Sequence, residues 1–254
     1  MSTLAAEEVI DRYRRQMLLS WLDEGAQERI CRSSVLVTRV GGLGGPLAQS
    51  LAIAGVARIV FFHEGELLEE DLHRMMLMDC KGVGEARAPQ AEASLRKLRD
   101  DGFDVRGFPT RITADDARRW TTKCDLAIGA APTYEERFVL NDAALAAGKP
   151  YVDVAMYAGE VHVLCVDPGV SACLRCLIPK TPPWRPDFPV LGAVAALAGN
   201  WAALLCVRIL AGSDQVPWGS YLHFDTDTST LTRTTIPRRA DCPACANARK
   251  REKP

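Results

Sequence analysis

Two pairs of cysteines have the spacing of metal ligands. Cys173 and Cys176 are separated by two residues, as are Cys242 and Cys245, and 65 residues lie between the pairs. This spacing lets both sulfurs of a pair reach one ion at about 2.3 Å, and two pairs complete a tetrahedral zinc site. Because four protein ligands leave no open position, we expect a structural zinc that joins the end of the chain to its middle. The alternatives are four unrelated core cysteines or two redox-active pairs.

A glycine-rich turn near the front of the chain is the second chemical feature. Gly41, Gly42 and Gly44 follow a predicted buried strand, and Pro46 suits the first turn of the next helix. In such a strand–turn–helix unit, backbone N–H groups at the helix N-terminus can approach phosphates. The turn is therefore a candidate nucleotide site.

The residue before this turn argues against ordinary nucleotide binding. A dinucleotide fingerprint needs glycine where this chain has Arg39. Two other interpretations stay open. The chain could be a nicotinamide-dependent oxidoreductase with Glu64 on a ribose hydroxyl, or the glycines could serve only the close packing of helix on strand.

The hydrophobic pattern predicts the elements that must position these residues. One or two amphipathic helices over 5–31 precede the sheet, and the order strand, glycine turn, helix, strand makes a parallel βαβ unit. Strands are predicted at 35–40, 57–62, 104–109, 125–128, 151–157, 160–167, 221–225 and 230–234, and helices at 46–55, 86–100, 135–147 and 190–210. We expect an α/β fold with a Rossmann-like sheet in a single domain, 1–254. It comprises N-terminal helices (1–33), a nucleotide-binding-like core (34–167) and a zinc-stapled C-terminal extension (168–254).

Composition narrows the class of protein. The chain is 48% hydrophobic and 25% charged with a formal net charge of −1, so no overall field favours nucleic acid or an anionic membrane. The apolar stretch 190–210 contains Asn200 and Arg208, and we interpret it as a buried helix rather than a membrane span. Nine cysteines without a signal-peptide pattern indicate a reducing compartment, and the cytoplasm is the expected location.

A series of short segments occurs in a specific order. They are 12–16 (RYRRQ), 41–44 (GGLG), 52–56 (AIAGV), 71–74 (DLHR), 83–84 (VG), 173–176 (CLRC), 209–212 (ILAG) and 242–245 (CPAC). This series resembles the MoeB/ThiF/HesA family, the bacterial relatives of ubiquitin-activating enzymes, over about residues 8–247. The resemblance implies binding of ATP and magnesium, and adenylation of the C-terminal carboxylate of a small ubiquitin-fold sulfur carrier that ends in Gly-Gly. It also implies a dimer in which an arginine near the N-terminus of one chain reaches the ATP site of the partner.

The resemblance assigns three candidate catalytic residues. Arg15 matches the arginine that acts on the partner's site, and Arg74 matches an arginine that contacts phosphate. Arg87 replaces a lysine of the family at the phosphates, which keeps the charge and changes its geometry.

Other matched positions depart from the family. With the three glycines, His63, Glu64 and Asp71 are candidate cofactor-binding residues, but His63 replaces the ribose-binding aspartate and Asp71 replaces an asparagine. Pro132 stands where the family has its magnesium-binding aspartate. The crossover loop, 179–189, contains Trp184 and lacks the cysteine with which some family members form a covalent link.

These departures all fall on one site, so we expect a degraded ATP site. The leading hypothesis is a non-catalytic partner subunit, in a homodimer or a heterodimer with an intact relative. One alternative is an active adenylyltransferase that uses Glu64, Glu66 or Asp71 as substitute metal ligands. The other is a pocket reassigned to a different anion or a peptide carboxylate, with Arg39 and Arg74 as its cations.

Overall fold

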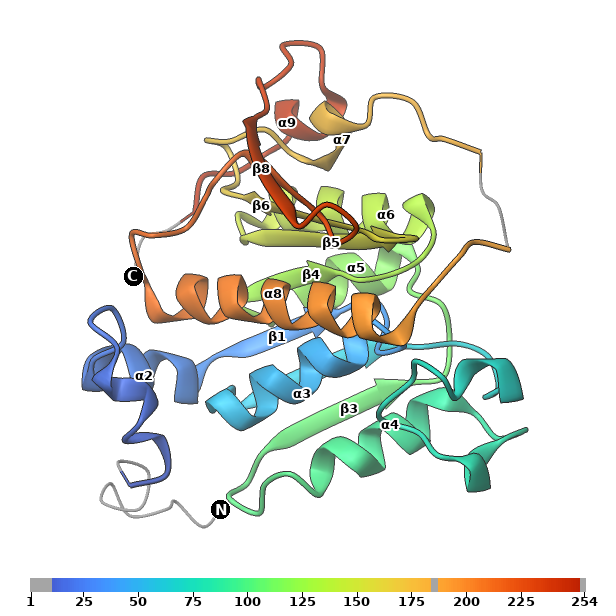
Figure 1. Ribbon diagram of the computed structural model, residues 1–254. Coiled ribbons are helices and arrows are strands. Elements are labelled where there is room, and N and C mark those ends of the chain that lie inside the picture. Colours follow the sequence, from blue (N-terminus) through green and yellow to red (C-terminus); the bar gives the residue numbers. More distant parts are fainter. Residues whose placement is uncertain (1–10, 184–186, 252–254) are drawn as a thin grey trace.

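The computed structural model describes residues 11–183 and 187–251, which form one mixed sheet of eight strands with flanking helices (Figure 1). The strand order across the sheet is β3-β2-β1-β4-β5-β6-β7-β8. The strands are β1 (Ser34–Val37), β2 (Arg58–Phe62), β3 (Asp104–Phe108), β4 (Leu126–Gly129), β5 (Tyr151–Tyr157), β6 (Glu160–Val166), β7 (Ser220–Asp225) and β8 (Thr230–Thr235). The first five in spatial order run parallel, and the last three add antiparallel pairs. The predicted α/β, Rossmann-like fold is confirmed.

Helices cover both faces of the sheet. On one face lie α3 (Gly44–Ala54), α4 (Arg87–Arg96) and α8 (Gly192–Ala211), with α2 (Glu24–Arg32) packed against α8 (Figure 1). The other face carries α5 (Ala114–Thr121) and α6 (Tyr134–Ala147). Side chains alternate along a strand, so Val35 and Val37 of β1 join the first core and Leu36 joins the second. The central strands are apolar on both faces for this reason.

Helix α8 is the longest described helix, and 11 of its 20 residues are buried. Its length and composition are also those of a membrane span, but it packs on α3 and on β5 and β6 inside the molecule. The crossing with α3 is close: a Cβ on Gly199 would lie 2.2 Å from the carbonyl oxygen of Leu43. The predicted buried helix is thus confirmed as part of the core.

Some predicted elements were wrong in extent, and several short helices were missed. The first strand ends at Val37, and α4 ends at Arg96. One or two helices were predicted over 5–31, and the described part of this region contains helical residues 11–13, a 3₁₀ turn, η1 (Gln16–Leu18), and α2. Further 3₁₀ turns are η2 (Glu69–Asp71) and η3 (Cys80–Gly82). Residues 1–10 and Trp184 lie outside the described residues.

The longest of the missed helices is α5. A capping box begins this helix, because Thr113 Oγ1 accepts from the backbone N–H of Asp116 at 3.1 Å and the Asp116 carboxylate accepts from the backbone N–H of Thr113. Only Ala117, Trp120 and Thr121 of the helix are buried. A short polar helix of this kind gives a weak periodic signal.

Candidate functional site

A cavity of about 500 Å³ lies at the carboxyl edge of the parallel strands. Its walls include the turns that follow β1, β2 and β4, together with the end of β5. The strand order reverses between β1 and β4, and open α/β sheets bind their ligands at such a point. Sequence-predicted residues that line this cavity are Arg39, Gly41, Gly42, His63, Asp71, Arg74, Arg87 and Pro132.

Arg39 is buried at the turn between β1 and α3, and two carboxylates bind its guanidinium. Its Nε donates to Glu136 Oε1 at 2.9 Å, and its Nη2 donates to Glu136 Oε2 at 2.9 Å and to Glu64 Oε1 at 2.7 Å. Burial alone would lower the pKa of Arg39, but the hydrogen bonds and charges of Glu136 and Glu64 raise it. The guanidinium therefore stays charged, and protein carboxylates already neutralise it.

The backbone of Arg39 also explains one glycine of the turn. A Cβ on Gly44 would lie 1.8 Å from the Arg39 carbonyl oxygen, which no side chain can tolerate. Gly44 is therefore required for the close approach of α3 to the end of β1, with or without a ligand. Gly41 and Gly42 precede Gly44 in the same turn, and both line the cavity.

Asp71 forms a second buried charge cluster. Its Oδ1 accepts from Arg74 Nη2 at 2.8 Å, and its Oδ2 accepts from Arg87 Nη2 at 2.5 Å. Asp71 is 2% exposed. Glu64 and Asp71, proposed above as substitute metal ligands, are thus both bound to arginines, whereas Glu66 is exposed.

His63 lies at the end of β2, inside the cavity wall. Among the described residues its Nδ1 has no hydrogen-bond partner. Burial, with the nearby charges of Arg39 and Arg87, lowers the pKa of His63 to about 3. The imidazole is therefore neutral at physiological pH.

The turn after β4 has no ionisable side chain at Pro132, the position that the sequence analysis matched to a magnesium-binding aspartate. It reads Ala130, Ala131 and Pro132, and the backbone N–H of Ala130 donates to Thr38 Oγ1 at 2.7 Å. Deeper in the wall, Arg137 and Asp153 form a buried ion pair through Nε and Oδ1 at 2.9 Å. Each arginine of this cavity consequently contacts at least one carboxylate, and Arg74 and Arg87 share that of Asp71.

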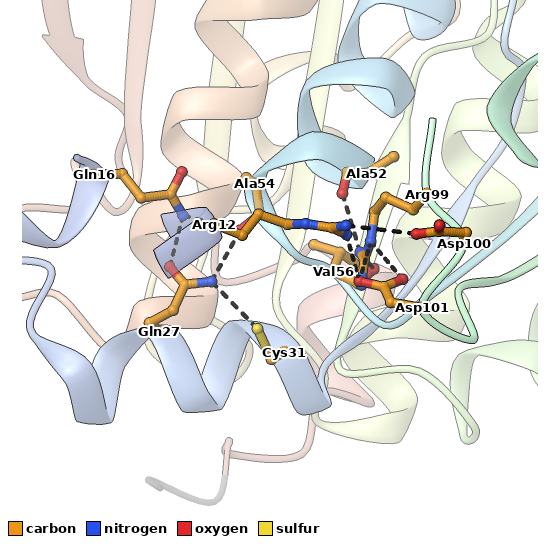
Figure 2. A network of polar contacts seen from close by, with 10 residues as sticks. All are labelled: Arg12, Gln16, Gln27, Cys31, Ala52, Ala54, Val56, Arg99, Asp100 and Asp101. Carbon is orange, nitrogen blue, oxygen red and sulfur yellow. Dashed lines mark hydrogen bonds and ion pairs between the residues drawn. The ribbon is translucent and has the colours of Figure 1, made fainter. Parts of the chain in front are cut away.

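Figure 2 shows how the N-terminal segment that contains Arg12 and Gln16 is attached to the neighbouring helices and to the loop after α4. Arg12 Nη1 donates to Asp101 Oδ2 at 2.8 Å, and Gln16 Nε2 donates to the carbonyl oxygen of Ala54 at 3.0 Å. These contacts fix the segment to the end of α3 and to the loop after α4. Arg15, by contrast, is exposed.

The four predicted metal-binding cysteines come together away from the cavity, beside the short helices α7 (Leu174–Leu177) and α9 (Pro243–Ala246). Sulfur–sulfur distances are 4.0 Å for Cys173–Cys176, 3.6 Å for Cys173–Cys242, and 3.5 Å for both Cys173–Cys245 and Cys176–Cys245. Four sulfurs placed tetrahedrally about 2.3 Å from zinc are about 3.8 Å apart, so the cluster fits one zinc ion.

The surroundings shift the thiol pKa values of this cluster in different directions. Burial raises the pKa of Cys173 and raises that of Cys245 to about 11, whereas at Cys176 burial is outweighed by hydrogen bonds, first that of the Arg239 backbone N–H, which lower the pKa. A divalent cation would stabilise the thiolates and release the thiol protons. The backbone N–H of Arg239 donates to Cys176 Sγ at 3.4 Å and supports the charged sulfur.

Comparison with known proteins decides the family. The ThiF family profile matches residues 13–244, nearly the whole chain. The chain belongs to the ThiF family. The heterocyst HesA protein of Trichormus variabilis is 34% identical over 239 residues, which cover 94% of this chain and 89% of that protein. The sulfur carrier protein adenylyltransferase of Thermus thermophilus is 33% identical over 251 residues, or 95% of this chain and 92% of that protein.

Solved structures of more distant proteins support the same fold. E. coli MccB in complex with MccA-N7isoASN superposes with a TM-score of 0.82 at 17% identity. The match covers 93% of this ThiF-family chain and 74% of the MccB chain. At this identity the likeness concerns the fold alone.

The site of this ThiF-family chain contains residues that sequence reasoning did not single out. Glu136, Arg137 and Asp153 complete the charge pairing of the cavity, and His162 lines its wall. In the sequence, each of these residues is a charged or polar residue within a predicted helix or strand. Such a residue can be assigned to the cavity only when the strand order is known.

Proposed function

We propose that this chain is a non-catalytic subunit of a system that uses ATP to adenylate the C-terminal glycine of a ubiquitin-fold sulfur carrier. An intact ThiF-family relative would supply the catalytic site. The name of the T. thermophilus relative supports the reaction class, and the charge pairing of the cavity supports the non-catalytic role.

The pairing of Arg39 with Glu136 and Glu64 carries this proposal. A triphosphate needs unpaired cations and a magnesium ion held by carboxylate, since catalysis of phosphoryl and adenylyl transfer rests on such charges. Here Arg39 is bound by two carboxylates, and the residue at the family's magnesium position is Pro132. Freeing Arg39 for a phosphate would leave Glu136 buried without its partner, at a cost of several kcal/mol.

The other arginines of the cavity lead to the same inference. Within the described residues, Arg74 and Arg87 share the buried carboxylate of Asp71, and Arg137 is paired with Asp153. Each arginine that lines the cavity therefore contacts a carboxylate, and Arg74 and Arg87 share a single one. An incoming polyanion would have to compete with carboxylates that are already desolvated and close.

A surface suited to a second ThiF-family chain lies on α3 and α8. Ile53 is 56% exposed on α3, and Leu197 and Leu204 are 41% and 42% exposed on α8. A hydrogen bond from Ser50 Oγ to Asn200 Oδ1 at 2.8 Å brings the two helix faces together. Apolar side chains gathered on adjacent helices are typical of a protein interface, and Arg15 is exposed as a residue acting on a partner must be.

Calorimetry with ATP and magnesium tests the proposal. The purified, zinc-loaded chain should show no binding up to millimolar ATP, while the T. thermophilus relative, titrated in parallel, should bind. Micromolar binding by this chain, followed by pyrophosphate exchange with a Gly-Gly carrier, would establish an active adenylyltransferase instead. Binding of an anion without magnesium, lost in an Arg39→Gly variant, would establish the reassigned pocket.

We also propose that the four-cysteine cluster holds a structural zinc. The matching sulfur separations support it, and so does the position of the cluster between residues from the middle and the end of the described chain. Four sulfur ligands would fill the coordination sphere, so this metal would take no part in the adenylation chemistry.

A further inference from the structure

A second group of metal-ligating side chains lies on the antiparallel half of the sheet. In the β6–β7 pairing His162 is directly opposite His223, and Glu160 lies two residues before His162 on the same face of β6. The Glu160 carboxylate oxygen and one nitrogen of each imidazole lie within 4.8 Å of one another. Register between two strands distant in the sequence therefore creates a cluster of two imidazoles and one carboxylate.

The distances in this cluster are close to those of a metal site and longer than those of hydrogen bonds. Glu160 Oε2 lies 3.5 Å from His162 Nε2 and 3.8 Å from His223 Nε2. Nitrogen and oxygen ligands placed tetrahedrally about 2.05 Å from a metal are about 3.3 Å apart. An ordinary N–H···O hydrogen bond would bring the same atoms to about 2.9 Å. An imidazole binds a metal along the lone pair in its ring plane, so one of the two stacked rings would have to turn for both nitrogens to reach a single ion.

One nitrogen in the cluster lacks a partner. His223 Nε2 is buried and, within the described part of the chain, makes no hydrogen bond. A buried polar atom without a partner is destabilising, so a ligand that contacts it would stabilise the fold. Because this nitrogen faces the carboxylate of Glu160 and the imidazole of His162, a cation between them would remove the deficit.

The opposite side of the His162 ring is already held. Tyr221 Oη lies 2.5 Å from His162 Nδ1, and the Tyr221, His162 and His223 rings are stacked within 13° of parallel. Ligating histidines usually donate their second N–H to an oxygen, which fixes the tautomer that presents the other nitrogen to the metal. Tyr221 is placed to accept that hydrogen bond.

We propose that Glu160, His162 and His223 bind a divalent transition metal such as Zn²⁺ at the border of the central cavity. Two imidazoles and one carboxylate suit such an ion and not Mg²⁺ or Ca²⁺, which prefer oxygen ligands. Three protein ligands leave a coordination position for water or another ligand, unlike the four-cysteine cluster. Since His162 also lines the cavity, a metal held here lies at its edge. The proposal does not rest on the proposed function.

Metal counting on the untagged, full-length chain tests this site. The protein is dialysed against micromolar Zn²⁺, and zinc per chain is measured by mass spectrometry for the wild type and for His223→Gln, Glu160→Gln and His73→Gln. We expect two zinc ions per chain in the wild type, one in the first two variants, and two in His73→Gln, which removes an exposed histidine outside the cluster. The one zinc retained by the cysteines shows that each variant has folded.

Two results would overturn the proposal. One is a wild type that holds a single zinc, and the other is a His223→Gln variant that still holds two. Neither result bears on ATP binding, so failure here and failure of the proposed function are separable.

Discussion

His63 illustrates how neighbours set the charge of one residue. The imidazole is enclosed at the end of β2, and two arginines lie near it, so its protonated form is disfavoured by both burial and repulsion. In the unfolded chain the same side chain has the ordinary pKa of about 6.5. The folded and unfolded states therefore bind different numbers of protons between pH 6.5 and about 3.

This difference predicts a pH dependence of stability. Below pH 6.5 the unfolded state takes up a proton at His63 that the folded state refuses, so the free energy of unfolding falls as pH falls, until about pH 3. The contribution is at most about 1.4 kcal/mol per pH unit. Urea unfolding between pH 7 and 4.5 should therefore show a shallower decline for His63→Gln than for the wild type. His73→Gln, at an exposed histidine, should keep the wild-type slope; equal slopes for all three proteins would refute the assignment.

At the scale of elements, the sequence predicted most of what the structure contains, because long apolar runs and punctuating glycines determine the core. The parallel strands, α3, α6 and α8 and the cysteine pairs all follow from local patterns. Helix α5 was missed because few of its residues face the core. The pairs Arg39–Glu136 and His162–His223 could not be predicted, since each depends on strand order and register rather than on spacing along the chain.

The crossing of α3 and α8 gives a prediction at this scale. Gly199→Ala should destabilise the fold by about 1–3 kcal/mol, because the new methyl group would force α8 away from the Leu43 carbonyl. Chemical denaturation measures the change. The matched control is Ala193→Ser on the exposed part of α8, which should cost less than about 1 kcal/mol. A stabilised Gly199→Ala protein, as helix propensity alone would predict, would contradict the close packing.

For the whole molecule, the exposed apolar faces of α3 and α8 predict self-association or association with a relative. Leu204→Glu places a charge on this surface and should shift sedimentation velocity toward the monomer without changing the melting temperature by more than a few degrees. Leu231→Glu, at a 60% exposed leucine on the edge strand β8, is the control and should leave the assembly unchanged. A wild type that is monomeric at micromolar concentration and does not bind a relative would count against this interface.

Zinc binding at the cysteines is a second prediction for the whole molecule. Cys176→Ser should lose one zinc per chain relative to the wild type and lower the melting temperature, by about 2–4 °C for each kcal/mol lost. Cys80→Ser, at an exposed cysteine outside the cluster, should change neither quantity. Full zinc content in Cys176→Ser would show that the metal is held elsewhere.

The division of the cysteine cluster between two distant segments also has a consequence for synthesis on the ribosome. Chains emerge from the N-terminus and begin to fold as they emerge, so the parallel strands and the carboxyl edge that bears the cavity are available before Cys242 and Cys245 exist. Until then Cys173 and Cys176 form half a site, with thiols open to oxidation or to a competing metal. If the cluster binds zinc as proposed, the complete site forms last, when most of the fold is already in place.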